Sequence, residues 1–120
     1  MESILTSTKD KVGVAEGYTV FDEQIIDHIN SAFSRLTTLG VVTAGFSIAD
    51  DIDEWEDLEI PVDQLNMVKT FVFLYVRMLF DPPQTSYMQN IMQGQIDKHE
   101  WLLAAMADAV AHPLSPEDAA

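Results

Sequence analysis

Histidines are the side chains in this sequence best suited to bind a metal or transfer a proton near neutral pH, and the chain has three: His28, His99 and His112. A di-metal site in a helical bundle requires Glu-x-x-His pairs, and no glutamate lies three residues before any of these histidines. The sequence from His99 resembles the start of a zinc-protease helix, but Leu103 occupies the position of the second histidine. We therefore expect histidines with structural roles and no metal site.

A second candidate for chemistry is the acidic run from residue 50 to residue 59, which places seven carboxylates in ten positions. Calcium binding is the sharpest hypothesis, because Asp51 and Asp53 have the alternating spacing of a calcium loop. Trp55 occupies the next ligand position, however, and no glycine follows it. We expect a solvated acidic loop instead, anchored by the Trp55 ring packing onto the rest of the protein.

The other motifs of enzyme chemistry are missing from the sequence. It contains no Gly-x-Ser-x-Gly motif and no glycine-rich phosphate-binding loop. The absence of cysteine excludes disulfides, a thiolate zinc site and a cysteine nucleophile. We therefore expect no catalytic residue, no cofactor and a protein that is not an enzyme.

The charge balance limits the partners that the protein can bind. Six basic and 20 acidic residues give a net charge of −14 over 120 residues. Binding to nucleic acid or to an anionic membrane surface requires basic side chains that neutralise phosphates. The longest apolar stretch, residues 67–80, is shorter than the about 20 residues that span a bilayer. We expect one acidic domain with no specific nucleic-acid binding and no membrane binding.

Apolar residues recur at helical spacing in four segments. The sequence therefore predicts an all-α fold, a small bundle of about four helices with a long acidic loop between the second and the third. The first helix is an arm within residues 1–13. The second begins with Asp22 as N-cap and ends at Gly40, which can adopt the left-handed conformation that often follows a helix. The loop occupies residues 41–60.

The third helix starts near Pro61, with Asp63 as its expected cap, and a Pro-Pro pair ends it. Its run 71–76 is rich in β-branched and aromatic residues, so a strand is an alternative, although the length and flanking residues favour a helix. Thr85 or Ser86 caps the fourth helix. The residues expected along one side of that helix are Tyr87, Met88, Ile91, Met92, Gln95, His99, Leu102, Leu103 and Met106.

The end of the fourth helix lacks the usual stabilising charges. Cations complement the helix dipole at this end, yet the last cation of the chain is Lys98. Residues 104–111 have high helix propensity but little to bury. We expect this end to fray in the free protein and to become ordered on a partner. The helical domain then spans residues 1–110, and residues 111–120 form a flexible tail.

Two runs are similar to a known family. Residues 21–41 contain Phe-Asp-x-x-Ile-Ile-x-His-Ile-Asn-Ser-x-Phe and then Leu-x-x-Leu-Gly-Val, and residues 68–83 read Val-Lys-Thr-Phe-Val-Phe-Leu-x-Val-Arg-x-Leu-Phe-Asp-Pro-Pro. Shorter matches are residues 45–48, Trp55 and Glu100-Trp101. In this order and at this spacing, they resemble the head–tail connector family of long-tailed bacteriophages.

The resemblance implies a structural virion protein, also called an adaptor or head-completion protein. Such a protein forms a ring under the portal, joins the DNA-filled head to the tail and extends the DNA channel. The implied partners are the portal protein, a stopper or tail-completion protein, and further copies of the chain in a dodecamer. The implied location is the virion neck, after assembly in the host cytoplasm. The candidate portal-docking residues are Val110, Ala111, His112, Pro113 and Leu114.

The net charge leads to two further expectations, and it also supports an alternative function. Subunits of charge −14 repel one another, so we expect a mainly monomeric free protein that assembles on the portal as a template. An acidic loop facing the channel would repel DNA phosphates and let the genome slide; its candidate residues are Asp50, Asp51, Asp53, Glu54, Glu56 and Asp57. The alternative is a small acidic protein that mimics DNA and inhibits a DNA-binding enzyme, although the carboxylates here cluster in one loop.

Overall fold

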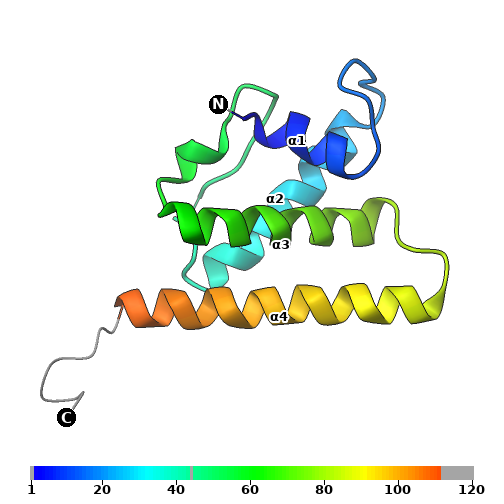
Figure 1. Cartoon of the computed structure of the whole chain (residues 1–120). Coiled ribbons are helices and arrows are strands. Elements are labelled where there is room, and N and C mark those ends of the chain that lie inside the picture. Colours follow the sequence, from blue (N-terminus) through cyan, green and yellow to red (C-terminus); the bar gives the residue numbers. More distant parts are fainter. Residues whose placement is uncertain (1, 44, 112–120) are drawn as a thin grey trace, which may run out of the picture.

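The computed structural model describes residues 2–43 and 45–111, and helices account for most of them (Figure 1). The elements are α1 (Ile4–Lys11), α2 (Asp22–Thr38), the short 3₁₀ helix η1 (Trp55–Leu58), α3 (Val62–Phe80) and α4 (Ser86–Ala111). These described residues contain no strand, and one isolated β-bridge pairs Ser3 with Glu54. The predicted all-α bundle of four helices is confirmed, and the strand alternative at residues 71–76 is wrong.

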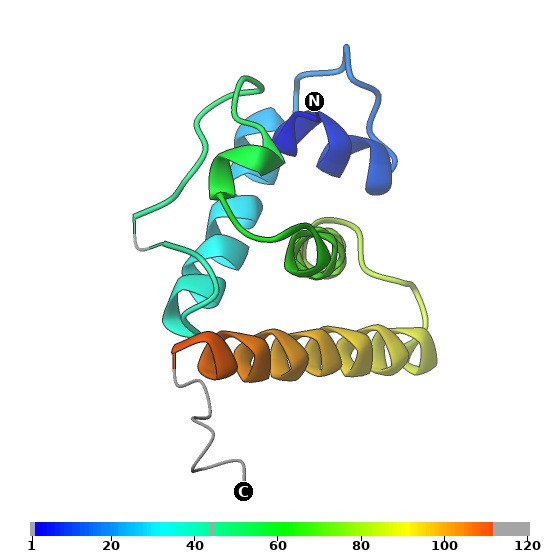
Figure 2. The ribbon, with the colours of Figure 1, turned by 60° about the vertical axis from the view of Figure 1, so that its left-hand side comes forward.

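Helix α3 is the centre of the bundle. It packs against α4 and against α2 and α1. In Figures 1 and 2, α4 runs along one side of α3, whereas α1 and η1 lie on the opposite side. The buried residues of α3 are Leu65, Val68, Phe71, Val72 and Val76. A helix covered on several sides needs such a wide apolar surface, which explains the nearly continuous apolar sequence.

Both predictions of an aspartate N-cap are wrong. Helix α2 begins at Asp22 itself, with Phe21 at the N-cap and no side-chain capping hydrogen bond. The Asp22 carboxylate instead forms an ion pair with the buried Lys9, with Oδ1 and Nζ 2.7 Å apart. Asp63 likewise lies in the first turn of α3, after Pro61 at the N-cap. The helix dipole stabilises an aspartate in the first turn as well as one at the cap, so residue type alone does not fix the boundary.

Two other helix ends agree with the predictions. Gly40 follows α2 with a φ of 81°, a left-handed backbone conformation that suits glycine, and its N–H donates to the Thr37 carbonyl at 3.0 Å. Of the two expected caps for α4, Thr85 is the one used, and Ser86 is the first helical residue. The Thr85 Oγ1 accepts a hydrogen bond from the Met88 N–H at 3.2 Å.

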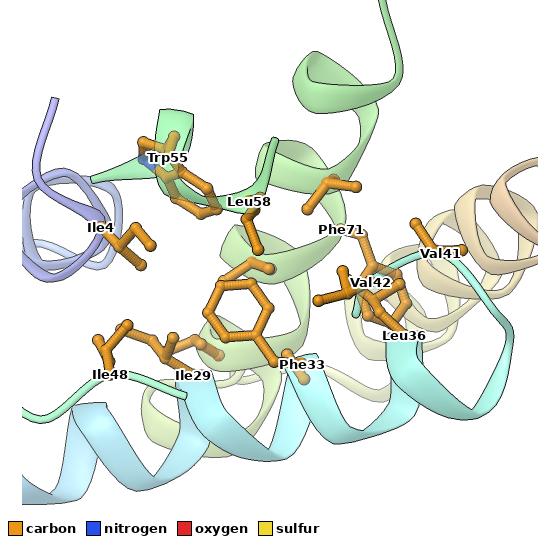
Figure 3. Packing of buried hydrophobic residues seen from close by; sticks show 14 of the residues in the cluster. Ile4, Ile29, Phe33, Leu36, Val41, Val42, Ile48, Trp55, Leu58 and Phe71 are labelled. Carbon is orange, nitrogen blue, oxygen red and sulfur yellow. The ribbon is translucent and has the colours of Figure 1, made fainter. Parts of the chain in front are cut away.

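One hydrophobic core joins these elements (Figure 3). Its largest fully buried side chains are Trp55, Phe33 and Phe71. The Phe33 ring makes edge contacts with Trp55 and Phe46, at centroid separations of 6.3 and 5.2 Å. The segment between α2 and α3 contributes buried side chains from Val41, Val42, Ile48, Trp55 and Leu58. That segment therefore contributes to the core, and it also carries the acidic run 50–59.

Candidate partner-binding surfaces

The acidic run 50–59 is tied to the start of α1 through the main chain. The Ile4 N–H donates to the Asp53 carbonyl at 2.9 Å, and the Trp55 N–H donates to the Glu2 carbonyl at 3.2 Å. Because these are backbone contacts, they hold the run beside α1 without engaging its carboxylates.

The six carboxylates singled out from the sequence differ in exposure and in partners. The Asp50 carboxylate accepts a hydrogen bond from the Ile52 N–H at 2.9 Å, and that of Asp57 accepts one from the Glu54 N–H at 2.8 Å. The exposed members are Asp50, Asp51, Glu56 and Asp57, and the half-buried members are Asp53 and Glu54. None of the six takes part in an ion pair within the part of the chain that the structure describes. The run is therefore a strongly negative surface.

Trp55 anchors this run, as predicted. Its side chain is fully buried, and its Nε1 donates to the Ser7 Oγ at 2.8 Å. The ring packs edge-on against Phe73 at a centroid separation of 5.6 Å. The Lys69 Nζ lies 5.9 Å from the centre of the Trp55 ring and 3.5 Å from the Glu2 carboxylate. The run cannot leave α1 and α3 without exposing this tryptophan.

A surface groove beside α1 extends the negative surface. Its volume is about 680 Å³, and its lining includes the carboxylates of Glu2, Asp10, Glu16 and Asp51. Lys11 is the one cation in the lining, and its Nζ lies 5.8 Å from the centre of the Phe73 ring. Such a groove attracts cationic groups and repels phosphates.

The few cations of the chain are mostly committed to internal contacts. On the surface, Arg35 of α2 forms an ion pair with Glu100 of α4. The hydrogen bond and the negative charge of Glu100 raise the pKa of Arg35 above its ordinary value. Arg77 and Lys98 are exposed, and neither forms an ion pair among residues 2–43 and 45–111. They are the cations most available to a partner.

Helix α4 has a second kind of surface, which we call the α4 outer face. It consists of Tyr87, Ile91, Gly94, Lys98 and Trp101, which recur at spacings of three and four. Tyr87 is 74% exposed and Trp101 is 69% exposed. At about 100° per residue, these two side chains lie about 40° apart around the helix, on the same side.

Tyr87, Met88 and Ile91, which were expected along one side of α4 together with Leu103, do not share its environment. All three are exposed, and the buried residues of α4 up to residue 109 are Ile96 and Leu103. The physical reason is that α4 packs mainly on α3, so only a narrow stripe of its surface is covered. At about 100° per residue, Tyr87 and Trp101 lie on the opposite side of α4 from Leu103. The sequence therefore shows that they cannot share one face, but not which face is buried.

A third surface, the Tyr18 patch, consists of Tyr18, Val20, Phe21 and Phe80. The Phe21 ring contacts Tyr18 and Phe80 at centroid separations of 5.8 and 5.3 Å. Val20 is 71% exposed. In both views the connection between α1 and α2, which carries most of this patch, lies on the side of α3 opposite to α4 (Figures 1 and 2). The two apolar surfaces therefore face different directions.

The residues considered for metal chemistry do not come together. The His99 ring Nδ1–H donates to the Gln95 carbonyl, one helical turn earlier, at 2.9 Å. The described residues contain no group of three or more His, Cys, Asp or Glu placed to hold a metal ion. Among those same residues, no helix has both the length and the apolar character needed to cross a membrane.

The candidate portal-docking residues lie at the far end of α4 or beyond it. Val110 and Ala111 are its last two residues, and residues 112–114 fall outside the described part of the chain. The docking role of all five residues stays a prediction.

Fold and surfaces together define a small acidic all-α protein with several faces suited to protein partners. A family model described as phage connector protein matches residues 4–110, which is nearly the whole chain. The chain belongs to this family, as its sequence motifs indicated, and the family is structural rather than enzymatic. The protein is thus a bacteriophage head–tail connector and a component of the virion. Comparisons with curated proteins and with solved structures gave no match.

Proposed function

We propose that this connector forms a ring under the portal, joins the DNA-filled head to the tail and extends the DNA channel. The observation that supports this function is the family match over residues 4–110. A compact helical core with several separate surfaces is consistent with a subunit that must contact the portal, a tail component and its neighbours at once.

The proposed partners are the portal protein on one side and a stopper or tail-completion protein on the other. The ring is a dodecamer in the virion neck, and it assembles in the host cytoplasm. Docking to the portal uses the end of α4 and the following residues, 110–114. A docked partner there supplies the hydrogen-bonding and positive groups that the last turn of α4 lacks.

Assembly occurs on the portal because free subunits repel one another. At a charge of −14, two copies experience a repulsion that only salt or a template overcomes. A portal with several equivalent docking sites raises the local concentration of subunits and replaces that missing attraction. The free protein is therefore mainly monomeric at low salt.

The exposed carboxylates of the acidic run face the DNA channel in this proposal. Replacing Asp51 and Glu56 by lysine should slow or trap DNA ejection while leaving ring assembly intact, because cations in the channel bind phosphates. The matched control replaces Asp27 and Asp63, two other exposed aspartates, by lysine and makes the same change in net charge. Equal ejection rates for wild type and both variants would place the run outside the channel.

The direct test of the function is capture of the protein by its cognate portal, followed by electron microscopy of the complex. We expect a ring beneath the portal in the class averages. Failure to associate with an intact portal would instead favour the acidic DNA mimic. Titration against a DNA-binding protein, with DNA as competitor, would then test that alternative.

A further inference from the structure

The five residues of the α4 outer face include two exposed aromatic rings and no acidic side chain. Residues 86–96 contain no charged side chain, although the chain as a whole carries −14. Tyr87 and Trp101 lie about 21 Å apart along the helix and flank Ile91, so the face is long enough for a protein interface. Its one cation, Lys98, is exposed and forms no ion pair with the described residues. Exposed apolar surfaces of this kind mark interaction sites.

The Tyr18 patch has the complementary character. Its apolar side chains include the highly exposed Val20 and the half-exposed Tyr18. Three exposed acidic residues, Glu16, Glu23 and Asp81, lie close to it in sequence. The patch therefore offers an apolar centre with a negative rim, whereas the α4 outer face offers an apolar centre with a cation.

We propose that the α4 outer face of one subunit packs on the Tyr18 patch of the next subunit in the ring. Two different, complementary surfaces on one chain produce a head-to-tail contact, and such contacts generate a ring when the rotation between neighbouring subunits closes. Helix α4 and the connection between α1 and α2, which carries most of the Tyr18 patch, lie on opposite sides of α3, so a subunit can use both surfaces at once (Figures 1 and 2). Trp101, at the C-terminal end of this face, is the proposed anchor, because aromatic residues dominate interface energetics.

This contact also explains how such acidic subunits can sit side by side. The contact places the uncharged first half of α4 at the interface and pairs Lys98 with the carboxylates around the Tyr18 patch. The acidic run, tied to α1 and η1, stays outside the contact. The inference rests on the proposed ring, and it adds the surfaces that form it.

The absence of cysteine from the sequence allows a direct test by cross-linking. Two single-cysteine variants, Val20→Cys and Ile91→Cys, are mixed, one of them carrying a mass tag, and treated with a short bis-maleimide. Ala49→Cys, at an exposed position between α2 and α3, is the control. The mixture is examined bound to the portal, and without portal at about 1 M NaCl, where repulsion between subunits is screened.

The proposal predicts cross-links between Val20→Cys and Ile91→Cys in excess over all other pairs. Cross-links of Ile91→Cys with itself alone would indicate a two-fold contact and overturn the head-to-tail assignment. Portal-bound rings without the mixed cross-link would overturn this inference and leave the proposed function standing. A mixed cross-link at high salt, with no association to the portal, would support the contact and contradict the function. No cross-link in either condition would overturn the contact.

A variant that introduces a negative charge on the α4 outer face tests the same contact without a cysteine cross-link. Trp101→Glu should raise the concentration needed for half-maximal association at high salt at least tenfold, because it removes the anchor and adds repulsion. Asn66→Glu, at an exposed position on α3, introduces the same charge and should leave association within twofold of wild type. Circular dichroism confirms that both variants are folded. Equal effects of the two substitutions would contradict the assignment.

Discussion

The two tryptophans lie in regions of opposite character. Trp55 has no exposed surface, and it joins η1 to α1 and α3 through its ring and its Nε1–H. Trp101 is 69% exposed on a helix that packs mainly on α3. The half of the molecule around Trp55 is held by interlocking contacts, whereas α4 presents a long open face. The same residue type thus stabilises the fold in one region and is available to partners in the other.

The largest expected effect is on the free energy of unfolding, to which the two tryptophans should contribute very differently. Trp55→Ala should lower the free energy of unfolding by about 3–5 kcal/mol, because it opens a cavity and removes the partner of the Ser7 hydroxyl. Trp101→Ala should change it by less than about 0.5 kcal/mol. Urea denaturation followed by circular dichroism measures both. Similar losses of unfolding free energy for the two variants would contradict the different roles assigned to the two tryptophans.

The next effect concerns Lys9, a buried cation in the same well-tied region. Its Nζ contacts the Asp22 carboxylate and donates to the Glu16 carbonyl at 2.9 Å. Lys9→Met should cost about 2–3 kcal/mol, because it leaves a partly buried carboxylate without its partner. If that explanation is right, Asp22→Asn should rescue part of the loss in a double-mutant cycle. Strictly additive effects would show that the pair is not coupled.

A smaller effect is expected at Asn30, which holds the segment after α2. Its side-chain amide donates to the Ile48 carbonyl at 2.9 Å and accepts from the Ile48 N–H at 2.8 Å. Asn30→Ala should lower stability by about 1–2 kcal/mol, since two buried backbone groups lose their partners. Ser31→Ala, on the exposed side of α2, is the control. A neutral Asn30→Ala would mean that this segment is held by its apolar residues alone.

The smallest effect is local and concerns the end of α4. Amide hydrogens of residues 107–111 should exchange faster in the monomer than those of residues 71–76 in α3. The end of α4 has no cation in its last turn, whereas α3 is covered on several sides. Binding to the portal should slow exchange at 107–111. Strong protection in the isolated monomer would contradict the predicted fraying.

Sequence patterns predicted the positions of the helices, but they did not predict how the helices cover one another. Helical spacing, Gly40 and the Pro-Pro pair after Phe80 predicted the four helices and most of their ends, because these signals are local. The misassigned caps at Asp22 and Asp63 reflect an ambiguity in the same local physics, which favours acidic residues both at the cap and in the first turn.

The candidate surfaces depend on which helices cover which, and a single sequence does not contain that information. Tyr87 and Ile91 look like core residues by spacing, yet α4 has too few neighbours to bury them. Lys9 gives no sequence signal of burial, because its ion-pair partner Asp22 lies across the connection between α1 and α2. The burial of Trp55 was predictable, because the large apolar ring of a tryptophan among seven carboxylates is stabilised by packing on the core.

The most direct test of the central claim is the mass in solution by light scattering, at low salt, alone and then with the cognate portal. We expect a monomer near 13.4 kDa for the protein alone and a ring-sized increase in mass on the portal. Subunits that stay monomeric beside an intact portal would contradict the connector ring. A stable ring without the portal in dilute, low-salt buffer would contradict assembly on a template.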